Sequence, residues 1–149
     1  MPRRSPLSAD PLQPRPKRKP TPFPFVLEAL APLHPEVRHM FSAHAVYVGD
    51  KILFMLRDSL KSPIDNGLWL VFSEEFKFAK IPAALKKEFP SIRPIQLLEG
   101  AIKHWLLLPS GHSSFEQDSL HACDLALARD YRLGRIPKSR QSPGRKQHK

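Results

Sequence analysis

The middle of the chain alternates short apolar runs with polar turns, and the clearest pair of runs predicts a β-hairpin. Residues 45–48 and 52–56 are rich in β-branched and aromatic side chains, and they flank Gly49 and Asp50. A glycine supplies the positive φ that a tight connection between antiparallel strands needs. The sheet of this protein is therefore expected to be organised around this hairpin.

Four other apolar runs extend the predicted sheet. Residues 37–41 form a short first strand or lead into the hairpin, and residues 68–72 are continuously apolar, as in a buried strand. Residues 92–98 and 101–108 predict a second hairpin. Because proline lacks a backbone N–H, Pro94 places the first of these two strands at a sheet edge or a bulge. The runs together predict an antiparallel sheet of about five strands.

Three short helices are predicted, one before these strands and two between them. A helix over residues 24–31 starts at a proline, which is tolerated in the first helical turn. Ser73 is placed to cap a helix over residues 74–79. A further helix over residues 82–89 also has a proline in its first turn, where the missing N–H costs little.

A longer helix is predicted over residues 115–129. Ser114 and Gln117 have the spacing of a capping box at its start. Its apolar stripe consists of Leu120, Cys123 and Leu127, joined by Ala126 and, at its margin, by Phe115. This helix is therefore expected to cover one face of the sheet.

The order of these elements predicts an α+β fold, because strands and helices do not alternate regularly as in a parallel sheet. The 149 residues suffice for one domain and not for two ordinary domains plus tails. We assign the domain to residues 23–133, between tails at 1–22 and 134–149. The first tail holds seven prolines, and the second consists largely of Arg, Lys, Ser, Gln, Pro and Gly. Both tails are expected to be disordered.

The excess of positive charge lies in the tails. Residues 1–20 hold six Lys/Arg and one acid, residues 132–149 hold seven Lys/Arg and no acid, and the remainder holds 11 bases and 13 acids. Basic tails of this kind either solubilise a domain or hold nucleic-acid phosphates without sequence preference. The residues that would bind phosphate are Arg15, Lys17, Arg18, Lys19, Arg135, Lys138, Arg140, Arg145 and Lys146.

The pattern of reactive side chains predicts neither catalysis nor a metal or cofactor. The seven histidines lack the spacing and the cysteine partners of a zinc site. Glycine-rich phosphate loops and the GxSxG elbow are missing from the sequence. Cys123 lies in an apolar stripe, where a buried and inert thiol is expected. A small-ligand pocket would require four side chains to converge, namely His44, Arg57, Trp69 and His104.

A cytoplasmic location is expected. The sequence has one cysteine, which cannot form an internal disulfide, and this favours a reducing compartment. No apolar run in the sequence approaches the roughly 20 residues needed to cross a bilayer, so no membrane partner is expected. The basic N-terminus is followed by prolines, where a secretory signal would have an apolar stretch.

The segment from Met40 to Arg57 resembles the opening of the TfoX N-terminal domain. In that family a Met-Phe-Gly-Gly element precedes a hairpin that carries a Gly-Lys turn. Here Met40 and Phe41 precede the hairpin, while Ser42 and Ala43 replace the paired glycines.

Two later strands, at residues 66–69 and around Trp105, are similar to the same scheme and to the related YjbR-like domains. The resemblance covers residues 24–137 and implies a small bacterial α+β domain with a regulatory or interaction role, like that of TfoX in competence, and with no established catalytic residues. We therefore expect a noncatalytic domain whose partner is another protein. Nonspecific nucleic-acid binding through the tails is the alternative.

Overall fold

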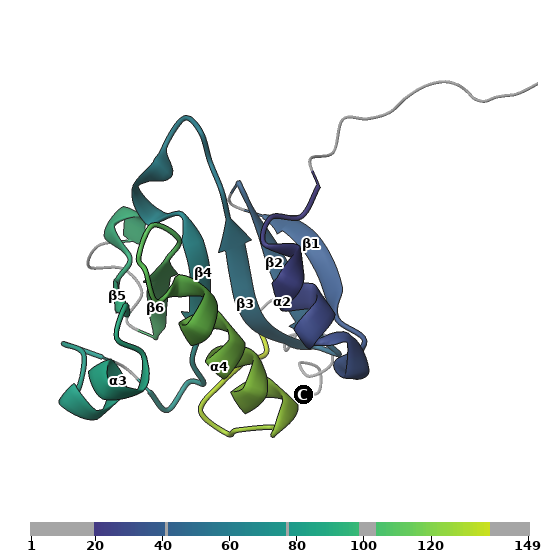
Figure 1. Cartoon of the computed structure of the whole chain (residues 1–149). Coiled ribbons are helices and arrows are strands. Elements are labelled where there is room, and N and C mark those ends of the chain that lie inside the picture. The colour runs from purple at the N-terminus through teal and green to yellow at the C-terminus, as the bar shows by residue number, and fades with distance from the viewer. Residues whose placement is uncertain (1–19, 41, 77, 99–103, 138–149) are drawn as a thin grey trace, which may run out of the picture.

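The computed structural model describes residues 20–40, 42–76, 78–98 and 104–137 of the chain. Within these residues, six strands form one antiparallel sheet with the order β1-β2-β3-β4-β6-β5 (Figure 1). The strands are β1 (Glu36–Met40), β2 (Ala43–Val48), β3 (Lys51–Arg57), β4 (Gly67–Val71), β5 (Arg93–Pro94) and β6 (Trp105–Pro109). The predicted α+β fold is confirmed, with slightly more strands than expected.

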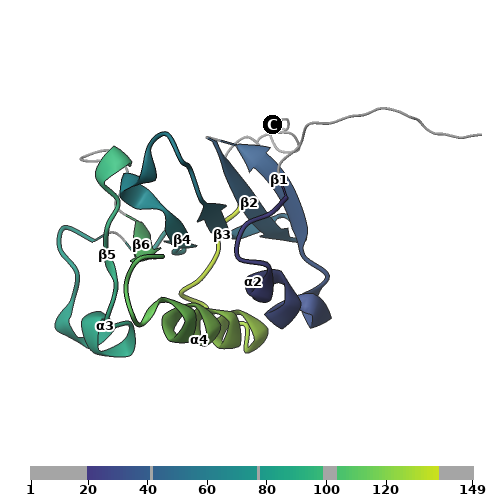
Figure 2. The same ribbon diagram turned by 45° about the horizontal axis from the view of Figure 1, so that its top comes forward.

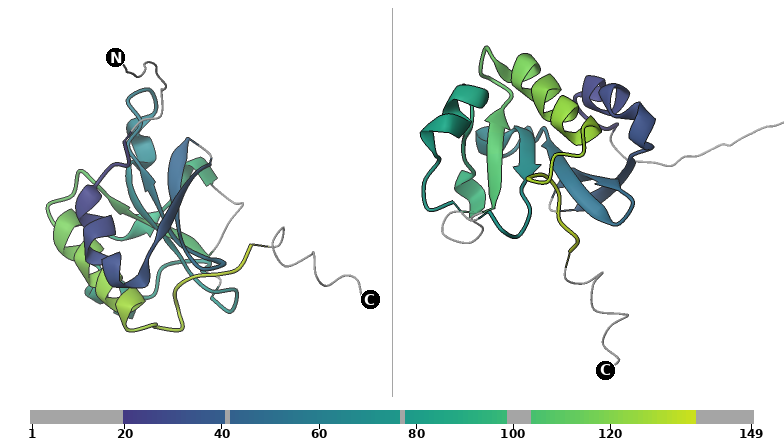
Figure 3. Two further views of the ribbon diagram at one scale, coloured as in Figure 1. Left: turned by 90° about the vertical axis from the view of Figure 1, so that its right-hand side faces the viewer. Right: turned by 90° about the horizontal axis from the view of Figure 1, so that it is seen from below.

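The α-helices lie together on one side of this sheet (Figures 2 and 3). The helical elements are α2 (Pro24–Ala29), α3 (Ala83–Glu88), α4 (Phe115–Leu127) and the single-turn 3₁₀ helices η2 (Ala31–Leu33), η3 (Pro63–Asp65) and η4 (Gln96–Leu98). The start of α2 is fixed to α4 by edge-to-face contacts of Phe23 and Phe25 with Phe115, at centroid distances of 5.0 and 6.0 Å. None of the described helices is long and apolar enough to span a membrane.

Each face of the sheet carries its own apolar cluster. On the helix side, buried strand residues such as Phe54, Leu70 and Leu108 pack with Val26 of α2 and Cys123 of α4. The opposite face buries a second cluster formed by Ala43, Ala45, Tyr47, Ile52, Met55, Trp69, Val71, Ile95 and Leu107. Because successive strand residues point to opposite faces, two buried faces require continuously apolar strands. The apolar runs of the sequence meet this requirement.

The predicted hairpin is confirmed and forms the connection between β2 and β3. Gly49 has a φ of 62° at the first turn position, as the sequence requires. The two strands pair from Val48 and Lys51 to His44 and Leu56, with one irregularity after Val46. Both strands are slightly longer than predicted.

The predicted helix over residues 74–79 is wrong. The described residues between 73 and 80 form turns and bends. The N–H of Ser73 donates to the carbonyl of Arg132 at 2.8 Å, so this residue continues the sheet pairing and starts no helix. Phe78 then packs its ring edge-on against Phe72, at 5.0 Å. Tertiary contacts therefore override the local helical composition.

The predicted strand over residues 92–98 is much shorter, because the chain leaves the sheet after Pro94. Strand β5 has two residues, and η4 follows it. The N–H groups of Gln96 and Leu97 donate to the buried Asp65 carboxylate, which turns the chain away from β6. The prediction that Pro94 lies at a sheet edge is confirmed. Residues 99–103, which include the expected turn and the start of the next strand, lie outside the described residues.

Helix α4 covers the sheet as predicted, and Cys123, Ala126 and Phe115 of the predicted stripe are buried, but Leu120 and Leu127 are not. Leu120 and Leu127 are 38% and 36% exposed, whereas Ala122, Cys123 and Ala126 are buried with Phe115. Small side chains on the buried face let the helix lie close to the strands. The predicted capping box is also wrong: the side chain of Ser114 makes no capping hydrogen bond.

Residues 132–135, which we call the C-terminal insert, enter the sheet between the start of β3 and the end of β4. Single antiparallel bridges join Ile52 to Arg135 and Phe72 to Leu133. Gly134 has a φ of 92°, and its N–H donates to Val71 O at 2.7 Å. The sequence assigns residues 134–149 to a disordered tail, yet Gly134 and Arg135 pair within the sheet. Residues 20–22, 136 and 137 of the tails are also described, and residues 1–19 and 138–149 lie outside the described residues.

Candidate functional site

The four side chains nominated for a pocket lie in different places. Arg57 and Trp69 lie on the sheet face away from the helices, because Trp69 belongs to the second cluster and Arg57 follows Met55 by two residues. His44 pairs with Leu56 of the helix-side cluster and therefore lies on the other face. His104, just before β6, contacts the Arg135 guanidinium. The structure thus brings together only two of the four.

The polar groups of these two residues hold the loop between β3 and β4. The Trp69 indole N–H donates to Asp65 O at 2.9 Å, and the Arg57 guanidinium donates to Ser62 O at 2.6 Å. Arg57 is 5% exposed. This arrangement fixes a loop and does not form a ligand pocket.

The basic residues nominated for phosphate binding divide into one described residue and eight others. Arg135 lies in the C-terminal insert, and its guanidinium donates to Glu74 at 3.2 Å and contacts His104. The positive charge of Arg135 is therefore engaged by Glu74 and His104 of the same domain. The other eight lie outside the described residues: Arg15, Lys17, Arg18, Lys19, Lys138, Arg140, Arg145 and Lys146.

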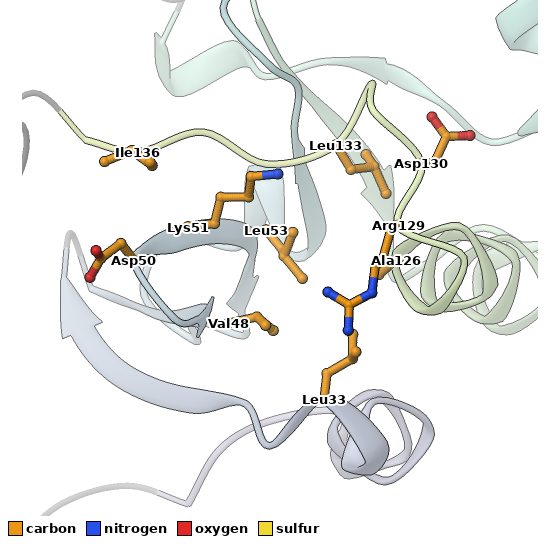
Figure 4. A pocket seen from close by; sticks show the side chains of 10 residues that line it. All are labelled: Leu33, Val48, Asp50, Lys51, Leu53, Ala126, Arg129, Asp130, Leu133 and Ile136. Carbon is orange, nitrogen blue, oxygen red and sulfur yellow. The ribbon is translucent and has the colours of Figure 1, made fainter.

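A different pocket lies where α4, η2 and the start of β3 meet the C-terminal insert (Figure 4). Its volume is about 330 Å³. It is lined by Leu33, Val48, Asp50, Lys51, Leu53, Ala126, Arg129, Asp130, Leu133 and Ile136. We call it the Arg129 pocket. Apolar side chains form most of its wall, and two bases and two acids complete it.

The charged side chains of this pocket differ in where they point. The Arg129 guanidinium points into the space between Leu33, Val48 and Leu53, whereas the carboxylates of Asp50 and Asp130 point away from it (Figure 4). Within the described residues, Arg129 forms no hydrogen bond or ion pair through its side chain. The pocket therefore presents a positive charge, on a residue that is itself exposed to solvent.

The backbone at the end of α4 fixes the position of Arg129. The N–H of Arg129 donates to Ala126 O at 3.0 Å, and the N–H of Asp130 donates to Leu125 O at 2.9 Å. This is the hydrogen-bond pattern of a Schellman motif, in which glycine is the usual residue at the left-handed position. Here Arg129 occupies that position with a φ of 58°. An L-residue in this conformation costs about 1–2 kcal/mol.

An ion network supports the wall of the pocket at Asp130. The Arg132 guanidinium donates to Asp130 Oδ1 at 3.0 Å and to both carboxylate oxygens of Glu88 at 3.0 Å. His121 Nε2 lies 2.9 Å from Glu88. Hydrogen bonds from Arg132 lower the pKa of both carboxyl groups, and the two carboxylates raise the pKa of Arg132. The network ties the end of α4 to α3.

This network predicts a loss of stability in acid. A carboxyl group with a lowered pKa in the folded chain stabilises it above its ordinary pKa, which is 4.5 for Glu88 and 3.8 for Asp130. That contribution is lost as the pH falls through the lowered values. Chemical denaturation across pH 2–7 is expected to show a weaker acid dependence in Arg132→Met.

The matched control is Arg38→Met, which removes the exposed ion pair of Arg38 with Glu36 at 3.2 Å. Exposed pairs of this kind contribute little. The control should retain the acid dependence of the unmodified chain. Identical pH profiles for the Arg132 variant and the unmodified chain would contradict the role of the network.

The described structure places Cys123 in the core and gathers no metal-binding group around the histidines. Burial raises the pKa of the Cys123 thiol to about 12, and the residue is fully buried. It is therefore the inert thiol that its sequence position predicts. No group of three or more His, Cys, Asp or Glu residues in the described part of the chain could hold a metal ion.

The two edges of the sheet form a second candidate surface. Strand β5 at one edge has two residues, and Pro94 lacks an N–H to donate. Strand β1 at the other edge has five residues without proline and pairs only with β2 in the described chain. Short strands and prolines are common protections of a sheet edge. β5 has both, and β1 has neither.

Comparison with protein-family models, with curated proteins and with solved structures finds no match to this chain.

Proposed function

We propose that the chain is a noncatalytic regulatory or protein-interaction domain of the TfoX N-terminal-like type, which binds an extended segment of a partner protein along β1. The observation that carries this proposal is the difference between the two sheet edges. A partner strand that adds to β1 would use main-chain hydrogen bonds for affinity and side-chain contacts for specificity.

The contacts of Arg38 keep its side chain away from the outer edge of β1. Arg38 pairs with Glu36 at 3.2 Å, and its guanidinium lies over the ring of Tyr47 at 4.7 Å from the centroid. Both contacts hold Arg38 over a face of the sheet and away from the outer edge. Charges of both signs beside the edge would favour a partner strand with complementary charges.

The backbone at Ser42 supports the relation to the TfoX N-terminal domain. Ser42 stands where that family has the first of two glycines, and its φ is 60°. This left-handed conformation is one that glycine adopts at little steric cost. The backbone at Ser42 thus suits the first glycine of the family's pair, whereas Ala43, at the second position, is already a strand residue of β2.

The proposal is tested with proline variants of β1. In an antiparallel pair, adjacent residues direct their N–H groups alternately to the partner strand and to the outside. Of Arg38→Pro and His39→Pro, one therefore removes an outward donor, and the other breaks the pairing with β2 and serves as the control. Amide hydrogen exchange in the unmodified chain identifies which of the two residues has its N–H directed outward, because that amide exchanges faster.

Peptides selected from a random displayed library against the full chain serve as probes. They are expected to slow hydrogen exchange at the outward amides of β1 and to bind the outward proline variant at least about tenfold more weakly, since one main-chain hydrogen bond is lost. Selected peptides that leave β1 exchange unchanged would overturn the proposal, as would a selection that yields no binder.

The alternative is nonspecific nucleic-acid binding through the basic tails, which the charge difference between tails and domain favours. A mobility-shift assay over a salt series tests it, because phosphate contacts weaken steeply with salt. The matched control is the chain without residues 1–19 and 138–149, which keeps the C-terminal insert intact. A shift that vanishes in the shortened chain supports the alternative, and no shift at low salt excludes it.

A further inference from the structure

We propose that the Arg129 pocket binds a small ligand in which one carboxylate is attached to an apolar body, as in a medium-chain fatty acid. This inference rests on the pocket alone and is independent of the partner proposed for β1.

The floor of the pocket suits the apolar body of such a ligand. Leu53, Ala126 and Leu133 are at most 6% exposed and form a buried base, while Leu33 and Val48 are partly buried at the sides. Ile136 is 39% exposed at the rim. A volume of about 330 Å³ is near the lower end of the range for small-molecule pockets. An apolar chain or ring would cover these side chains.

The charges favour an anionic head group. Arg129 has no ion-pair partner within the described residues, and its guanidinium points into the pocket (Figure 4). Asp130 does not compete for it, because Arg132 donates to both oxygens of that carboxylate, at 3.0 and 3.1 Å. Lys51 adds a second base to the lining. A planar guanidinium binds a carboxylate through two parallel hydrogen bonds.

The two acidic residues of the pocket limit the negative charge that a ligand can carry. Asp50 and Asp130 both line the pocket, although their carboxylates point outward. A single negative charge is matched by Arg129, whereas a multiply charged phosphate would also be repelled by the negative charge of Asp50 and Asp130 at the pocket wall. Like charges repel one another more strongly as the distance between them falls. A monocarboxylate is therefore the best match.

Because Arg129 has a left-handed backbone, replacing it with glycine should change ligand binding and stability in opposite directions. Glycine would relieve the left-handed backbone at this position, so Arg129→Gly should stabilise the chain while removing the guanidinium. His34 has nearly the same conformation, with a φ of 55°, at the end of η2, and it does not line the pocket. His34→Gly is thus a matched control for the backbone effect.

The experiment titrates octanoate into the full-length chain below its micelle concentration, with octanol and octylamine as comparison ligands, and follows amide chemical shifts by NMR. Octanoate is expected to shift the amides of residues that line the pocket and to saturate. Octanol should bind at least about tenfold more weakly, since it lacks the charge-assisted pair with Arg129. Octylamine should not bind.

The variants complete the test. Arg129→Gly is expected to raise Tm by a few degrees and to weaken octanoate binding at least about tenfold, because the guanidinium contributes a charged hydrogen-bond pair. His34→Gly is expected to raise Tm similarly and to bind octanoate as the unmodified chain does. Equal octanoate binding in both variants would overturn the proposal, as would equal binding of octanol and octanoate, or no saturable shift at the pocket.

Discussion

Gly67→Ala is expected to cost the folded chain more than about 4 kcal/mol, a large share of the stability of an ordinary domain. Gly67 begins β4 and pairs with Arg57 of β3 and Pro109 of β6. A Cβ at this position would lie 2.1 Å from Leu108 O and 2.8 Å from Ser110 N, both of which are backbone atoms. The φ of 141° adds further strain for any L-residue. The substitution would therefore push the end of β6 away from the start of β4.

Two other glycines provide graded controls for this variant. A Cβ at Gly111 or at Gly49 meets no atom within 4 Å, and of the two only Gly49 has a positive φ, of 62°. Alanine should therefore change stability by less than about 0.5 kcal/mol at Gly111 and should cost about 1 kcal/mol at Gly49. Urea denaturation followed by the fluorescence of the two tryptophans gives the three values. A loss at Gly67 no larger than that at Gly111 would contradict the close approach of β4 and β6.

Features set by neighbouring residues could be predicted from the sequence. The β2–β3 hairpin depends on Gly49 and on two apolar runs beside it, and all of these signals lie within a few residues of one another. The edge position of β5 follows from Pro94, whose missing N–H acts wherever the strand lies. Such local rules do not require knowledge of the rest of the fold.

Pairings between distant segments could not be predicted in this way. The C-terminal insert has the polar and glycine-containing composition of a tail, and Ser73 has the side chain of a helix cap. In the structure these two features belong to one pairing, because Ser73 N donates to Arg132 O and Gly134 N donates to Val71 O. The pairing joins segments about 60 residues apart, and composition carries no information about such contacts.

The Arg129 pocket was missed for the same reason. Leu33, Lys51 and Arg129 come from three separate segments, and each has an ordinary local role at a helix end or a strand start. The sequence places Arg129 inside the predicted helix, as its last residue, whereas the helix ends at Leu127 and Arg129 occupies the position after the C-cap, where glycine is preferred. A binding role for the Arg129 side chain can be inferred only once its left-handed backbone and the pocket are known.

Asp65→Ala is expected to cost about 3–5 kcal/mol, because it removes a buried carboxylate that accepts three hydrogen bonds, one of them from the Arg93 guanidinium. Asp65 is fully buried at the end of η3. Its Oδ1 accepts hydrogen bonds from Gln96 N and from the Arg93 guanidinium, each at 3.1 Å, and its Oδ2 accepts one from Leu97 N at 2.7 Å. These bonds join the loop before β4 to the segment after β5.

Asp65→Asn should lose less stability than the alanine variant. Its amide oxygen can still accept from Arg93 and from Gln96, but its NH₂ group would face the N–H of Leu97, where two donors meet. The loss should be local as well as global. The amide of Leu97 is expected to lose protection from hydrogen exchange in both variants, and the amide of Gln96 in the alanine variant only.

The control for this pair is Asp58→Ala, which removes an exposed carboxylate that makes no hydrogen bond or ion pair through its side chain within the described residues. It should change stability by less than about 0.5 kcal/mol. If Asp65→Ala unfolded at the same denaturant concentration as this control, the Asp65 carboxylate could not be what holds η4 against η3. The chain departs from the predicted strand over residues 92–98 at η4. That result would therefore also mean that the Asp65 carboxylate is not the reason why β5 ends at Pro94.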